Sequence, residues 1–135
     1  MNDTFIPRSD YTTKKWYILD AKQKPVGRVA TVVSTMLQGK HKVDYHPAVD
    51  VGDYIIIINA KDIIFNTLTV RYHVYSPGRP GRSLKKVVNS TPQRIIESAV
   101  KNMLPNGLRS IIPSRLHIYE SAEHPHVAQN PIKLQ

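Results

Sequence analysis

The hydrophobic residues of this chain follow two patterns, which together predict an α/β protein. Short and nearly continuous apolar runs predict β-strands, at residues 15–20, 53–60, 70–75 and 116–119. Apolar residues repeated at i, i+3, i+4 and i+7 predict helices over residues 26–37 and from about residue 92 to residue 104. The expected order along the chain is therefore strand, helix, strand, strand, helix, strand.

The run at residues 53–60 is the strongest indication of a parallel sheet. It contains four consecutive isoleucines, Ile55 to Ile58, with no polar position among them. A strand with one face in water alternates polar and apolar residues, so this strand is expected to be buried on both faces. Residues 63–65 either extend it or form a short strand of their own. We expect an α/β fold in which a central, mainly parallel, four-stranded sheet is packed by helices.

Turn and cap residues indicate the boundaries of these elements. Gly39 predicts the C-terminal cap of the first helix, and Thr91-Pro92 predicts the start of the second. Residues 1–13 are polar with one proline and predict an N-terminal arm. The remaining residues, 14–135, predict a single α/β domain that ends in an extended, docked tail beginning near residue 124.

Composition excludes several classes of protein. The 135 residues include no cysteine, which rules out disulfides and thiol chemistry. The longest apolar run is too short to span a bilayer, so no membrane partner is expected. Residues 1–11 contain no apolar stretch typical of a signal peptide. If Met1 is the true start, we expect the protein to act in the compartment where it is made.

The positive charge is concentrated in one part of the chain. The net charge is +9, and residues 63–119 hold nine Lys and Arg against one acidic residue, whereas residues 1–62 hold nine against seven. Such asymmetry indicates a nucleic acid or an anionic membrane as partner. The alternative is a soluble basic domain with a solvated face, although surfaces that serve only solubility usually mix both signs.

Three basic loops, at residues 40–46, 76–86 and 107–115, are the leading candidates for an RNA interface. Arginine forks match phosphate oxygens, glycines allow close backbone approach, and aromatic rings stack on unpaired bases. Arg28 opens a helix, whose N-terminus favours phosphate. The candidate RNA-binding residues are Arg28, Lys40, His41, Lys42, Tyr45, His46, Arg71, Gly78, Arg79, Gly81, Arg82, Lys85, Lys86, Arg109 and Arg115.

Catalytic and metal chemistry have weaker support. Six histidines allow a His/Asp site in principle, but they lie among Lys and Arg that would repel a metal ion, so no metal or cofactor is expected. Asp50 and Asp53 are close in sequence and offer the paired carboxylates of a hydrolase. The simpler interpretation is turn formation before the buried strand. No catalytic residue and no small-molecule substrate are therefore expected.

Several blocks, in order, resemble a known family. They are KKWYILDAKQKPVGRVAT, LQGKHKVDYHPAVDVGDYIIIINA, GRPG, AVKNMLP and RLHIYESAEHPHVAQNP. Together they resemble the bacterial-type large-subunit ribosomal protein 13 family over almost all of the chain after residue 13. The resemblance implies a structural constituent of the large ribosomal subunit. Its partners would be large-subunit ribosomal RNA and neighbouring ribosomal proteins, and it would support subunit assembly and translation without catalysis.

The chain also departs from the family pattern in its connections. The loop at Asn66-Thr67 is about three residues short, and Leu108-Arg109-Ser110 replaces the usual Leu-Gly-Arg. A divergent organellar copy would explain these changes, with a plastid favoured over a mitochondrion or a bacterium. Two other functions remain open: a small RNA-processing or phosphate-handling enzyme, and a regulatory RNA-binding protein outside the ribosome.

Overall fold

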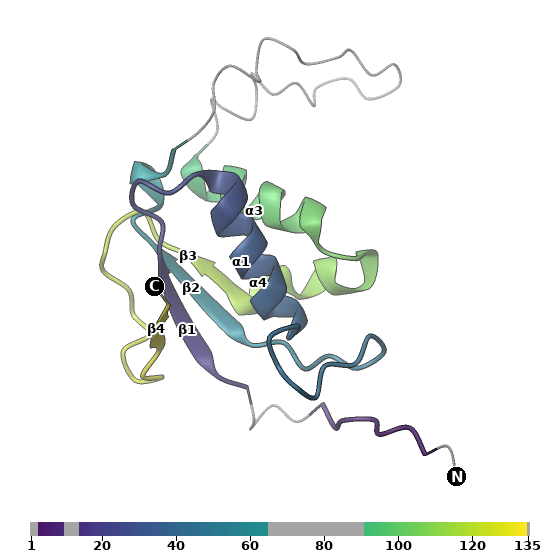
Figure 1. Cartoon of the computed structure of the whole chain (residues 1–135). Coiled ribbons are helices and arrows are strands. Elements are labelled where there is room, and N and C mark those ends of the chain that lie inside the picture. Colours follow the sequence, from purple (N-terminus) through teal and green to yellow (C-terminus); the bar gives the residue numbers. More distant parts are fainter. Residues whose placement is uncertain (1–2, 10–13, 65–90, 135) are drawn as a thin grey trace, which may run out of the picture.

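The computed structural model describes residues 3–9, 14–64 and 91–134. In it, a four-stranded sheet carries its helices on one face (Figure 1). The strands are β1 (Trp16–Asp20), β2 (Tyr54–Ile58), β3 (Leu116–Ile118) and β4 (Ile132–Leu134). The helices are α1 (Val26–Gln38), α3 (Pro92–Met103) and the short α4 (Ile112–Arg115), with 3-10 turns η2 (Ala60–Asp62) and η4 (Asn106–Ile111).

All strand pairs in the described sheet are parallel, and the strand order is β3-β2-β1-β4. This confirms the expected α/β fold with a parallel four-stranded sheet. The fourth strand is not the expected one, because β4 comes from the C-terminal tail and pairs Tyr17 with Ile132. The strand expected at residues 70–75 lies outside the described residues. The tail turns at residues 126–129 before Ile132–Leu134 adds this fourth strand to the sheet.

Burial explains why β2 lies at the centre of the sheet. Ile55, Ile56 and Ile57 are completely buried. Ile55 and Ile57 belong to the core beneath the helices, whereas Ile56 points to the opposite face, since side chains alternate along a strand. The expectation that this strand is buried on both faces is confirmed. Ile64 only makes an isolated bridge to Pro25, so residues 63 and 64 do not extend β2.

The two long helices form where the sequence predicts them. In α1, Val29, Ala30 and Val33 are buried in the core, and Gly39 ends the helix with a left-handed φ of +75°. Its N–H donates to the carbonyl of Met36, as a C-terminal cap requires. Helix α3 begins at Pro92, and its buried face packs on α1.

Residues 107–115 were wrongly expected to form a basic loop. They form η4 followed by α4, which leads directly into β3. Ile112 and Leu116 are buried in the core, and their burial holds the segment in this compact form. The change matters for the interface, because it turns Arg115 inward.

The face of the sheet opposite the helices carries a cluster of rings. Trp16 stacks on Tyr54 with ring centroids 4.5 Å apart, and His126 of the tail lies 5.2 Å from Trp16. The hydroxyl of Tyr119 lies 2.7 Å from Nε2 of His126. These contacts bind the tail between β3 and β4 to the body of the protein.

Candidate nucleic-acid interface

The structure describes eight of the proposed RNA-binding residues. The other seven are outside the described residues: Arg71, Gly78, Arg79, Gly81, Arg82, Lys85 and Lys86. Five of the eight lie in the segment between α1 and β2, at residues 40–46. The remaining three are Arg28 in the first turn of α1, Arg109 in η4 and Arg115 at the end of α4.

The segment at residues 40–46 presents only part of its charge to solvent. Lys40 and Tyr45 are exposed, and the tip residue Val43 is fully exposed. Backbone hydrogen bonds from Lys42 to Gly39 and from Tyr45 to Lys42 form its turns. Lys40 therefore lies on a loop whose turns are fixed by hydrogen bonds, and it is exposed to solvent.

Lys42 turns inward instead, toward the carboxylate of Asp53, and His41, although exposed, approaches the same carboxylate. The Lys42 amine donates to Asp53 Oδ1 at 2.7 Å and to the carbonyl of Val51 at 2.8 Å. His41 Nε2 lies 3.0 Å from Asp53 Oδ2. The side chain of Asp53 is completely buried, and its Oδ1 also accepts the backbone N–H of Lys15 at 2.9 Å. A buried carboxylate requires such partners.

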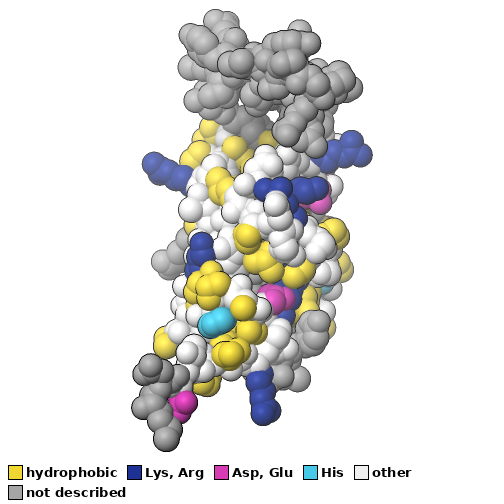
Figure 2. All heavy atoms as spheres, turned by 90° about the vertical axis from the view of Figure 1, so that its right-hand side faces the viewer, with side chains coloured by type: hydrophobic (Ala, Val, Ile, Leu, Met, Phe, Trp, Pro, Cys, Tyr) yellow, Lys and Arg dark blue, Asp and Glu magenta, His cyan; other side chains and the backbone are white. Residues whose placement is uncertain are grey.

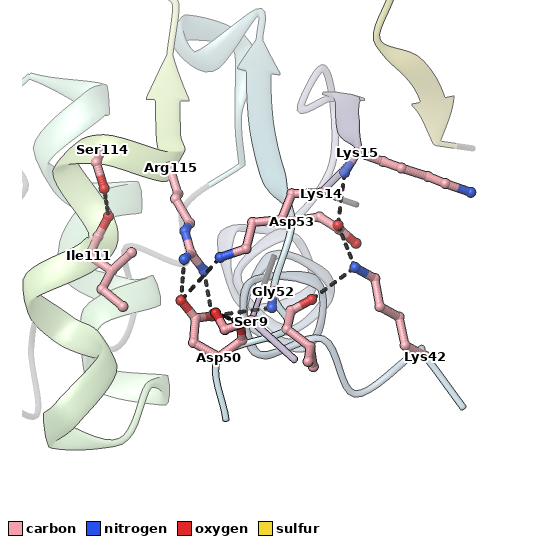
Figure 3. A network of polar contacts seen from close by, with 11 residues as sticks. Ser9, Lys14, Lys15, Lys42, Asp50, Gly52, Asp53, Ile111, Ser114 and Arg115 are labelled. Atoms are coloured by element: carbon pink, nitrogen blue, oxygen red, sulfur yellow. Dashed lines mark hydrogen bonds and ion pairs between the residues drawn. The ribbon is translucent and has the colours of Figure 1, made fainter. Parts of the chain in front are cut away.

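Asp50 forms a second, adjacent network (Figure 3). Both of its oxygens accept from the guanidinium of Arg115, and Lys14 lies 3.3 Å from Oδ2. The Arg115 side chain is only 5% exposed. Burial alone would raise the pKa of Asp50, but the hydrogen bonds and charge of Arg115, with the charge of Lys14, hold this pKa below its ordinary value. Arg115 thus neutralises an internal carboxylate.

Arg28 and Arg109 keep more of their side chains accessible. Arg28 is exposed and lines a hollow of about 350 Å³ with Lys24 and Pro25. Arg109 is half-buried, and its Nε donates to the carbonyl of Leu104 at 3.1 Å. Both sites combine a cation with a helical turn. Arg28 has the better exposure for contact with a phosphate.

Two of the segments that the sequence marks as basic meet at a groove. The groove of about 500 Å³ separates Tyr45 and His46 from Pro105, Leu108 and Ile111, and none of the lysines and arginines that the structure describes lines it. Figure 2 shows the corresponding side of the molecule, where hydrophobic side chains gather in the middle and Lys and Arg side chains lie apart around them. The groove therefore offers rings and apolar surface beside one carboxylate, that of Asp50, and the described lysines and arginines lie outside it.

The carboxylates do not have the arrangement of a hydrolytic site. Asp53 is completely buried and its Oδ1 is held by Lys42 and the backbone N–H of Lys15, and the lowered pKa of Asp50 is the opposite of what a general acid at neutral pH requires. Asp50 also accepts the N–H of Gly52 at 3.2 Å, which confirms its expected role in a turn. Within residues 3–9, 14–64 and 91–134, no group of three or more His, Asp or Glu is arranged to hold a metal ion.

Comparison with known proteins decides the family. A family model described as ribosomal protein L13 matches residues 14–125. The large ribosomal subunit protein uL13c of Trieres chinensis is 52% identical over 135 residues, covering 99% of this chain and 97% of that protein. The uL13 proteins of Chromohalobacter salexigens and Prochlorococcus marinus are 42% and 39% identical, each covering at least 97% of both chains.

The chain belongs to the ribosomal protein L13 family. The resemblance stated from the sequence blocks is therefore confirmed. The relatives are named as proteins of the large ribosomal subunit, which favours a structural role over the enzymatic alternative. No helix among the described residues is both long and apolar enough to cross a membrane.

Sequence reasoning predicted a turn role for the two aspartates but did not predict their ion pairs. Both were assigned to turns, whereas Asp53 bonds to the chain before β1 and to the loop after α1. The sequence did contain one indication. Asp53 directly precedes an apolar strand that is expected to be buried, and a buried carboxylate is stable only when cations or hydrogen-bond donors lie beside it. Lys42 is the cation beside Asp53, and Arg115 and Lys14 are the cations beside Asp50.

Proposed function

We propose that this protein is a structural constituent of the large ribosomal subunit, and that it binds large-subunit ribosomal RNA through its accessible cations. The observation that carries the proposal is the family match over residues 14–125, together with relatives named as large-subunit proteins. The net charge of +9 supports a polyanionic partner. Neighbouring large-subunit proteins complete the proposed set of partners.

Within the described residues, we assign phosphate contacts to Lys40, Arg28 and Arg109. Tyr45 and His46, at the edge of the groove, are assigned to stacking on bases or to packing against sugar. The proposed interface continues through residues outside the described part of the chain: Arg71, Gly78, Arg79, Gly81, Arg82, Lys85 and Lys86. Most of these contacts would position the protein rather than read sequence, since phosphates carry no sequence information.

The proposed location is the large subunit of a plastid ribosome, with a bacterial ribosome as the alternative. The relative named uL13c supports the plastid, because its identity of 52% exceeds the 42% of the bacterial relative from Chromohalobacter salexigens. The short loop at Asn66-Thr67 is consistent with a divergent organellar copy.

Sedimentation of native lysate at low and high salt tests this function. The chain is detected by mass spectrometry in each fraction, and a known large-subunit protein serves as reference. Co-sedimentation with the large subunit that persists through high salt is expected. Recovery mainly in the soluble fraction would instead support a regulatory RNA-binding protein outside the ribosome.

A further inference from the structure

We propose that Asp53 is a positioning residue of the RNA interface: its buried carboxylate fixes the loop at residues 40–46 from inside, so that Lys42 and His41 shape the loop while Lys40 faces the phosphate. This proposal rests on the proposed function, because it concerns how the same RNA contact is built. It gives two lysines, separated by one residue, opposite roles.

The first argument is the location of Asp53 where the loop, β1 and β2 meet. Its backbone N–H donates to the carbonyl of Met36 at the end of α1, at 3.3 Å. Its carboxylate accepts from the backbone of Lys15, directly before β1. Asp53 itself lies directly before β2. The start and end of the connection between α1 and β2 are therefore held at one residue.

The second argument is the ion pair that Lys42 of the loop makes with this carboxylate. Lys42 gives its amine both to Asp53 and to the carbonyl of Val51, and His41 approaches the second oxygen. The side chain of Asp53 is completely buried, whereas that of Lys42 is 24% exposed. Releasing Lys42 would leave a buried negative charge without its nearest cation, which is costly. The amine of Lys42 is consequently held in the protein when RNA binds.

The third argument is the effect of this anchor on Lys40. Lys40 is exposed and lies on the same turn, directly after the glycine cap of α1. A loop that is already held in one conformation loses little conformational entropy on binding. Less of the favourable interaction between Lys40 and phosphate is then offset by the cost of ordering the loop, and the affinity is higher. Asp53 acts on RNA binding through the loop and contacts no RNA itself.

Amine acylation of the full-length chain, read by mass spectrometry, tests the proposal directly. The protein is treated with an acetylating reagent, alone and bound to protein-free large-subunit rRNA. In the free protein we expect Lys42 to react about tenfold more slowly than Lys40, as for an ion pair worth about 1.4 kcal/mol that must open first. RNA should then protect Lys40 and leave Lys42 unchanged. Equal reactivity of the two lysines, or new protection of Lys42 by RNA, would overturn the proposal.

The salt dependence of binding separates positioning from mere stabilisation. Lys40→Gln should lower the slope of log affinity against log salt by about 0.9, the loss of one phosphate contact to paired RNA or DNA. Lys42→Gln, the matched control, should weaken binding and leave the slope unchanged. A lower slope for Lys42→Gln would overturn the proposal, because it would mean that Lys42 contacts phosphate.

Asp53→Asn provides the remaining comparison. It should weaken RNA binding and raise the acylation rate of Lys42 to that of Lys40. If Asp53→Asn does not fold, the acylation rates of Lys40 and Lys42 in the unaltered protein still test the proposal. If the unaltered protein binds no rRNA, the proposed function itself fails, while acylation of the free protein reports separately whether Asp53 holds Lys42.

Discussion

Asp50 and Arg115 form a two-pronged ion pair that joins positions 65 residues apart in the sequence. Asp50 precedes β2, and Arg115 precedes β3, the neighbouring strand. The pair lies at the end of the sheet where these strands begin, beside the Asp53 network (Figure 3). Two carboxylates thus organise the segments that lead into β1, β2 and β3.

Breaking this pair should destabilise the protein strongly. Arg115→Met leaves Asp50 with Lys14 as its remaining close cation, so we expect the free energy of unfolding to fall by about 3 kcal/mol. Urea unfolding followed by circular dichroism measures the change. The double variant Asp50→Asn/Arg115→Met should lose less than the sum of the two single variants. A loss below about 1 kcal/mol for Arg115→Met would show that the pair contributes no more than a surface ion pair.

The same pair should contribute to the acid sensitivity of the fold. The pKa of Asp50 in the folded protein lies below its ordinary value of 3.8. Its charge therefore contributes full stability above that value, and this stability is lost as pH falls through the folded-state pKa. In urea titrations between about pH 6 and pH 2.5, Asp50→Asn should flatten the acid limb of the stability curve. Asp44→Asn, at an exposed position, is the control. An unchanged acid limb in Asp50→Asn would contradict this assignment.

Two glycines should respond to alanine in opposite directions. A Cβ at Gly52 would lie 1.8 Å from the carbonyl oxygen of Leu37, so backbone must move, and we expect a loss of about 3 kcal/mol or failure to fold. A Cβ at Gly27, within α1, would meet nothing within 4 Å. Gly27→Ala should therefore stabilise the helix by roughly 0.5–1 kcal/mol. Thermal unfolding of both variants measures these changes, and equal melting temperatures would contradict the packing at Gly52.

The burial of β2 gives a further test. Ile57→Asp places an unpaired charge at a completely buried position, and we expect the chain not to fold. Ile64→Asp makes the same change at a residue that is 52% exposed, so this variant should remain folded. Circular dichroism and size-exclusion chromatography compare the two. A folded Ile57→Asp protein would show that Ile57 of β2 is not buried in the core.

Local sequence patterns were sufficient for β1, α1, β2, α3 and β3. Each has a periodicity or an apolar run of its own, and Gly39 marks the end of α1. β4 has no such signal, because the three residues Ile-Lys-Leu are too few to show a period and the strand is defined by its pairing with β1. The same applies to η4 and α4, whose shape depends on the burial of Ile112 against elements distant in the sequence.

The candidate site could be predicted only in part for a similar physical reason. Counting charges identified the basic segments, but charge in a sequence does not show which cations are already paired. Lys40 and Lys42 look alike in the sequence, and only the buried Asp53 distinguishes them. Arg115 looked equally available until the fold brought it to Asp50.

The pairing of β1 with β4 also has a consequence for the nascent chain. Tyr17 pairs with Ile132, so about 115 residues must be synthesised before this side of β1 finds its partner. At roughly 5–20 residues per second, the interval is on the order of ten seconds. During that time β1 has an open hydrogen-bonding edge, which can recruit strands from other molecules. β4 thus covers this edge of β1 and leaves a strand of only three residues at the edge, and short edge strands offer less to pair with other molecules.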